Sequence, residues 1–184
     1  ANYGGNLPAD NSGVIRYVRI AEGGLVAGPN NEVNGLTLQG VGHGTQISHV
    51  QVHGNLDDGI EWFGGTANVT HAVLTNNDDD DIDFDEGFKG NIQYALVIKR
   101  QDEGAVPVGS NDPRGLELNS SDGDYVPETA GSVANVTVIG GDAANSKSEF
   151  GMRIRGSVTA NIYNSAVAGY DNTCARIDDS DHDG

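Results

Sequence analysis

The chain has 184 residues, of which 27 are Asp or Glu and only 10 are Lys or Arg, so its formal net charge is −17. This length suits a single domain. The charge excludes nucleic acid and an anionic membrane surface as partners, because too few cations are present to neutralise phosphates. No apolar run reaches the roughly 20 residues that a membrane-spanning helix needs.

A hexapeptide with apolar residues at its first, fourth and sixth positions recurs six times along the chain. With a few substitutions it occupies residues 15–20, 47–52, 69–74, 92–97, 133–138 and 162–167. A tetrapeptide follows each copy, at residues 35–38, 59–62, 81–84, 115–118, 151–154 and 174–177. Where nothing is inserted, consecutive hexapeptides start 22 or 23 residues apart. A unit of this length with short strands and glycine-rich turns is typical of one coil of a β-solenoid, and the chain contains 27 glycines.

We therefore predict an all-β solenoid of about six coils over residues 1–178, with loop insertions in coil four at 101–111 and 120–131. A β-sandwich is the alternative, but sandwich strands do not repeat one motif in the same order. The apolar columns should point inward, including Ala175 and Ile177 of the last coil. We expect Cys174 to be a small buried residue there, and a single cysteine excludes an internal disulfide framework.

The third tetrapeptide position forms a column that period-2 alternation places on the outside. It reads Thr37, Glu61, Asp83, Glu117, Arg153 and Arg176. Carboxylates stacked at strand spacing repel one another unless a cation lies among them. Further carboxylates precede or follow these strands, at Asp57, Asp58, Asp79, Asp80, Asp81 and Asp85.

This cluster predicts one or two calcium sites, because calcium binds six to eight oxygens and prefers carboxylates and carbonyls. The predicted ligands are Asp57, Asp58, Glu61, Asp79, Asp80, Asp81, Asp83, Asp85 and Glu117. Zinc and copper fit poorly because the nearest histidines fall in another column. The alternative is a solvated acidic face without an ion.

The third hexapeptide position forms a second outward column of rings. Its members are Tyr17, His49, His71 and Tyr94. The column is either a strip for stacking carbohydrate or a ladder that stabilises neighbouring coils.

The last six residues, 179–184, read DSDHDG and form an acidic tail. Asp179, Asp181 and Asp183 match the first half of a calcium-binding loop. The alternatives are the start of a calcium-binding linker and a plain acidic tail.

The stretches GIEWFGGT at 59–66 and DIDFDEGFKG at 81–90 are the most specific parts of a resemblance that runs over residues 11–178. The chain resembles secreted or surface bacterial proteins of the pectate-lyase-like superfamily, mostly uncharacterised members of lipoprotein type. The terminal DSDHDG resembles the start of a thrombospondin type 3 calcium repeat. The resemblance implies a right-handed parallel β-helix and an extracellular or cell-surface location with the signal peptide removed. It implies no reaction, because β-helices carry many activities.

Two functions follow as expectations. The first is an extracellular, calcium-stabilised module with a structural, filament-forming or adhesive role, in which copies associate end to end or the chain belongs to a longer parent. The second is a calcium-dependent polysaccharide lyase, or another carbohydrate-active enzyme, acting on an acidic glycan. In a lyase, Arg153 or Arg176 would be the base and calcium would acidify the substrate. An extracellular polysaccharide is a candidate partner in either case.

Overall fold

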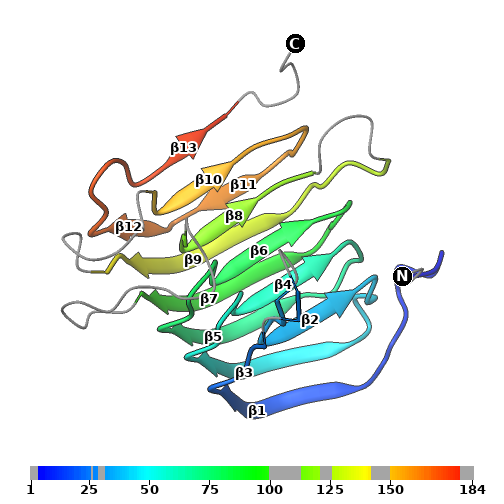
Figure 1. Cartoon of the computed structure of the whole chain (residues 1–184). Coiled ribbons are helices and arrows are strands. Elements are labelled where there is room, and N and C mark those ends of the chain that lie inside the picture. Colours follow the sequence, from blue (N-terminus) through cyan, green and yellow to red (C-terminus); the bar gives the residue numbers. More distant parts are fainter. Residues whose placement is uncertain are drawn as a thin grey trace.

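The computed structural model describes residues 4–25, 27–28, 32–99, 113–120, 126–141 and 150–178. All regular secondary-structure elements in these residues are β-strands (Figure 1). The strands are β1 (Val14–Ala21), β2 (Leu36–Gln39), β3 (Gln46–His53), β4 (Ile60–Phe63), β5 (Val69–Thr75), β6 (Ile82–Asp85), β7 (Asn91–Ile98), β8 (Leu116–Leu118), β9 (Ser132–Ile139), β10 (Met152–Ile154), β11 (Asn161–Tyr163), β12 (Ala166–Ala168) and β13 (Arg176–Ile177). A helix able to cross a membrane is not found among the described residues.

The strands form two parallel sheets whose order follows the chain. One sheet runs β1-β3-β5-β7-β9-β11, with β12 also paired to β9, and the other runs β2-β4-β6-β8-β10-β13. Each coil therefore adds one hexapeptide strand to the first sheet and one tetrapeptide strand to the second, as Figure 1 shows. This confirms a parallel β-helix of six coils. The first predicted insertion, at 101–111, lies outside the described residues.

The spacing of the hexapeptide is explained by a bend at its third residue. Tyr17, His49, His71 and Tyr94 all have positive φ, between 54° and 59°, and Asn135 and Asn164 continue the series. These residues drop out of the strand pairing, which passes from Arg16↔Ser48 to Val18↔Val50. A residue with left-handed backbone geometry bends the strand sharply. The first and fourth hexapeptide positions therefore both face the core, although they are three residues apart.

The core lies between the two sheets and contains mostly branched aliphatic side chains with a few rings. Trp62, Phe84 and Phe88 are fully buried at its centre. Gly35, at the first tetrapeptide position, must be glycine because a Cβ there would come within 2.4 Å of Val52 Cγ1. Asp81 occupies the same column in coil three and is also fully buried.

The last coil differs from the prediction. Cys174 is a free, exposed thiol, Ala175 is exposed, and Ile177 is 78% exposed although its column is buried in coils one to four. The register is as predicted, since Ile154 pairs with Ile177. The side chains are exposed because β13 is the edge strand of its sheet, with β10 on one side and no described strand on the other.

Candidate metal centre

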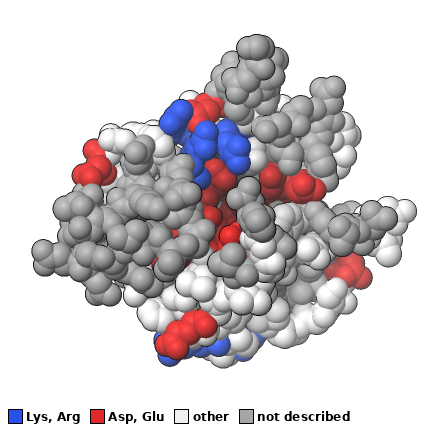
Figure 2. Space-filling view, in the orientation of Figure 1, with Lys and Arg blue, Asp and Glu red and all other residues white. Residues whose placement is uncertain are grey.

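An acidic pocket lies on the outer face of the second sheet, where the turns lead into its strands. Its volume is about 610 Å³. Figure 2 shows acidic side chains in a hollow on this face with basic side chains beside it. The lining residues are Glu32, Val33, Asn34, Thr37, Gln39, Asp57, Asp58, Glu61, Phe63, Asp79, Asp80, Asp83, Arg114 and Glu117.

The turns at the base of the pocket are connected from coil to coil by carboxylate-to-amide hydrogen bonds. The Asp80 amide donates to Asp58 Oδ1 at 2.9 Å, and the Arg114 amide donates to Asp80 Oδ1. Asp58 and Asp80 are 6% and 3% exposed, respectively. Each carboxylate thereby orders the turn of the following coil.

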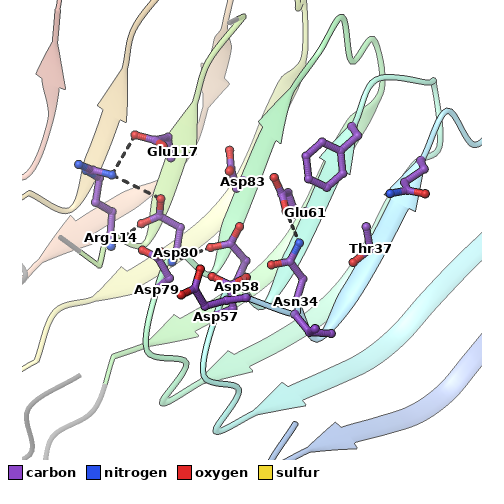
Figure 3. Close-up of a pocket in the computed structure, with 14 residues that line it drawn as sticks. Asn34, Thr37, Asp57, Asp58, Glu61, Asp79, Asp80, Asp83, Arg114 and Glu117 are labelled. Carbon is purple, nitrogen blue, oxygen red and sulfur yellow. Dashed lines mark hydrogen bonds and ion pairs between the residues drawn. The ribbon is translucent and has the colours of Figure 1, made fainter. Parts of the chain in front are cut away.

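Strands β4 and β6 supply the carboxylates of the pocket wall. Glu61 and Asp83 are direct partners in the parallel register, so their side chains lie side by side (Figure 3). Asn34 donates a hydrogen bond to Glu61 Oε2. Asp83 Oδ1 is buried and has no hydrogen-bond partner in the described structure, which is the situation of an oxygen positioned for a cation.

The carboxylates form two groups in which every chosen oxygen lies within 4.8 Å of the others. One group is Asp57, Asp58 and Asp79, and the other is Asp58, Glu61 and Asp83. Two oxygens that bind one calcium ion at 2.3–2.6 Å can be at most about 5 Å apart. The geometry of each group is therefore compatible with one such ion.

Burial and mutual repulsion make these groups weak acids in the absence of a cation. Burial, followed by the charge of Asp79, raises the pKa of Asp57 to about 6. Burial also raises the pKa of Glu61 to about 8, although the hydrogen bond from Asn34 opposes it. The pKa values of Asp58 and Asp83 are well above the usual range, again chiefly because both are buried among carboxylates.

Arginines contact the carboxylates at the other end of the pocket. Glu117 Oε1 lies 2.8 Å from Arg114 Nη1 and 3.1 Å from Arg155 Nε, and Arg153 Nη1 lies 3.9 Å away. Arg114 Nη1 also lies 3.5 Å from Asp80 Oδ2. Glu117 and Asp80 therefore have cationic partners within the chain.

Two predicted ligands lie outside the pocket, which corrects the expectation for them. Asp81 points away from it, pairing with buried Lys99 at 3.0 Å and accepting a 2.7 Å hydrogen bond from Asn77. Asp85 accepts a 3.2 Å hydrogen bond from Asn119 and is absent from the lining. The physical reason for Asp81 is its place in the inward-facing glycine column.

The two arginines considered as lyase bases also lie outside the pocket lining. Arg153 Nε donates to Asp178 Oδ2 at 2.6 Å, and Arg176 Nε donates to Asp178 Oδ1. Both guanidinium groups thus contact the same carboxylate, outside the pocket. The arrangement therefore does not support either arginine as a proton acceptor.

The rings of this column lie next to one another along the first sheet, with the two histidines stacked and the two tyrosines tilted against them by 34° and 35°. The ring centroids of His49 and His71 are 4.5 Å apart with planes 3° apart, and Tyr17 and Tyr94 continue the stack at 4.6 and 5.0 Å. Neighbouring rings thus cover one another's faces, which a sugar would need for stacking. The geometry favours a ladder between coils over a carbohydrate strip.

Asp179, Asp181 and Asp183 lie outside the described residues. Conversely, sequence reasoning missed Asn34 and Arg114, which line the pocket. Both occupy the position just before a tetrapeptide, as Asp58 and Asp80 do. An alignment of the repeats that included this position would have identified both residues.

These observations define the class of the protein as a parallel β-helix with an acidic pocket on one outer face. A family model described as a pectate-lyase-like β-helix domain matches residues 1–183. The chain therefore belongs to the pectate-lyase-like β-helix family. Neither a curated protein nor a solved structure matches the chain in the corresponding comparisons.

Proposed function

We propose that this β-helix binds calcium in the acidic pocket and that the ion stabilises the contact between coils two and three. The observation that carries the proposal is the group formed by Asp58, Glu61 and Asp83, whose oxygens lie within 4.8 Å of one another. Asp83 Oδ1 in this group is buried without a hydrogen-bond partner in the described structure. A calcium ion would satisfy this oxygen and cancel the repulsion between β4 and β6.

The chemistry of the other pocket residues supports an oxygen-binding cation. The described pocket lining contains neither histidine nor cysteine, so its side-chain ligands are carboxylate and amide oxygens and the hydroxyl of Thr37. Such donors suit calcium better than zinc or copper. Bound calcium would supply fixed positive charge, while Asn34 orients Glu61 and the Asp80 amide orients Asp58.

Thermal unfolding of the metal-stripped protein, with and without millimolar calcium, tests this proposal. Calcium at 100 times its Kd would add about 2.7 kcal/mol of stability, which for a chain of this size is a rise in Tm of roughly 5–10 °C. Glu61→Gln/Asp83→Asn should lose the rise. The matched control is Glu128→Gln/Asp171→Asn, which makes the same two chemical changes at exposed positions and should keep it. An equal rise in both double variants, or no rise in the parent, contradicts the proposal.

We further propose that the domain acts outside the cell or at its surface as a structural, filament-forming or adhesive module. Membership of the pectate-lyase-like family and the net charge of −17 support this location. Exposed apolar side chains at both terminal coils, such as Val14 at 61% and Ile177 at 78%, support contacts along the helix axis. Sedimentation velocity with and without calcium tests self-association, and a single monomeric species at all concentrations would contradict it.

A calcium-dependent polysaccharide lyase, or another carbohydrate-active enzyme, is the second candidate. The observation in its favour is that Arg114 lines the pocket beside the carboxylates, where its guanidinium group would contact an acidic group of a bound substrate. The assay is the ultraviolet absorbance of an unsaturated product formed from an acidic polysaccharide with calcium. Activity that disappears in Arg114→Lys would support this candidate, and inactivity on a panel of uronate polymers would count against it.

A further inference from the structure

We propose that copies of this chain stack head to tail and in register, so that coil six of one copy pairs with coil one of the next. The inference rests on the proposed contact along the helix axis and deepens it by naming the partner and the register. The two surfaces lie at opposite ends of the stack, where β1 is the outermost described strand at one end and β11 and β13 are at the other (Figure 1).

The apolar columns that are closed in the middle coils are open at both ends. Val50 of coil two is 1% exposed, whereas Val18, at the same position of coil one, is 39% exposed. In the second sheet, Trp62 is fully buried, whereas Ile177 of coil six is 78% exposed in the same column. A second copy stacked on either end would cover these side chains in the way that neighbouring coils cover one another within the chain.

The two ends match when the register of the chain is continued across the junction. Residues 14–21 of one copy then pair with residues 161–168 of its neighbour. The aligned inward pairs are Ile15 with Ile162 and Ile20 with Val167, and the aligned outward pairs are Arg16 with Tyr163, Arg19 with Ala166 and Thr37 with Arg176. Apolar groups therefore meet inside the helix, and none of these pairs places like charges opposite each other, which would oppose strand pairing.

The edge strands at the two ends also have the same shape. The bend at the third hexapeptide position is present in both, with φ at 54° for Tyr17 and at 44° for Asn164. Strand β1 can therefore follow β11 and β12 of another copy along its whole length. The two contacting surfaces differ from each other, so the contact repeats without closing and builds a filament rather than a dimer.

Backbone hydrogen bonds at the turn after the hexapeptide run in one direction along the helix. The amides of residues 22, 54, 76, 99 and 140 donate to carbonyls of the following coil, at residues 53, 75, 98, 139 and 168. The next amide in this series is that of Gly169, and none of the described carbonyls accepts from it. The first position of the acceptor column is Ala21, which pairs with His53. A head-to-tail neighbour thus supplies the acceptor that continues the series.

Disulfide crosslinking tests the contact and its register. Arg19→Cys/Ala166→Cys, in a Cys174→Ser background, places two exposed thiols on strands that the junction brings to about 4.8 Å, within reach of a disulfide. Within one chain these positions are five coils apart, roughly 24 Å, so any disulfide joins two chains. Mild oxidation in about 0.15 M salt, which screens the charge of −17 on each copy, should give a ladder of multimers on a non-reducing gel.

The matched control is Arg19→Cys/Asn161→Cys, whose second thiol is exposed at the same edge but lies roughly 16 Å out of register. It should crosslink no more than either single-cysteine variant does. Equal ladders from the two pairs overturn the register but leave self-association through another contact. A dimer formed by Arg19→Cys alone as efficiently as by the in-register pair overturns head-to-tail stacking, because coil one would then face coil one. Absence of crosslinks, with a monomeric parent in sedimentation velocity, overturns both this inference and the proposed contact along the axis.

A substitution inside the junction gives a second measurement. Val18→Lys should shift the parent assembly to monomers in sedimentation velocity, because it places a charge in a column that the junction buries. Val73→Lys makes the same change at a side chain of equal exposure, 38% against 39%, on the outer face of coil three and should assemble like the parent. Circular dichroism shows whether both variants are folded. Unchanged assembly of folded Val18→Lys contradicts the proposal, and the crosslinks remain the test if that variant does not fold.

Discussion

Replacing Glu61 by Gln in the metal-free protein should remove a large part of the dependence of its stability on pH. Gln has nearly the same shape and keeps an oxygen to accept the hydrogen bond from Asn34. It differs mainly in that it cannot ionise. The substitution therefore isolates the free energy that this buried carboxylate contributes through its proton.

The magnitude follows from the pKa of Glu61, which burial raises from 4.5 to about 8. Below pH 4.5 the residue is protonated in both the folded and the unfolded chain and has no effect. Between pH 4.5 and 8 the unfolded chain loses this proton while the folded chain retains it, so the free energy of unfolding falls as pH rises. A rise of one in pKa is worth about 1.4 kcal/mol, so the loss reaches roughly 5 kcal/mol above pH 8.

The assay is thermal unfolding in a chelator at pH values from 4 to 9. The parent and Glu61→Gln should have similar Tm values near pH 4, and the variant should melt roughly 10–20 °C above the parent near pH 9. Glu128→Gln, at an exposed site, should follow the parent throughout. Parallel curves for the parent and Glu61→Gln would refute the reasoning, because the carboxylate would then ionise in the folded state as readily as in the unfolded one.

Three further predictions concern the framework around the pocket. Lys99→Met should lower the free energy of unfolding in urea by about 3–5 kcal/mol, because it leaves Asp81 buried without its 3.0 Å partner. Adding Asp81→Asn should recover most of this loss, and a double variant as unstable as Lys99→Met alone would contradict the prediction. Gly59→Ala should cost about 1–3 kcal/mol, since its Cβ would lie 2.7 Å from the Asp81 carbonyl oxygen; an unchanged midpoint would show that the turn can move. His71→Val should lower stability by about 1–2 kcal/mol and His71→Asn by less, because φ is 58° at this position; equal losses would show that ring stacking, not the backbone, is decisive.

Much of the pocket was predictable from the repeat. The register of Thr37, Glu61, Asp83 and Glu117 follows from aligning the tetrapeptides, and the pairing confirms it. The separation of Glu117 from the other carboxylates was not predictable, because Arg114 and Arg155 approach it from positions outside its own column. The ion pair of Asp81 was not predictable either, because its partner Lys99 comes from the next coil.

The sequence by itself determined the architecture of this protein. Its apolar positions recur with a coil-length period, and stacking identical coils is the arrangement that buries all of them at once. Tertiary structure alone decided the charge state of the acidic residues. Twenty-seven carboxyl groups look alike in a sequence. In the fold, a neighbouring backbone amide makes one of them a structural anchor, a guanidinium within 3 Å makes another an ion pair, and burial makes a third a weak acid. Those differences depend on distances between coils, which the repeat period does not specify.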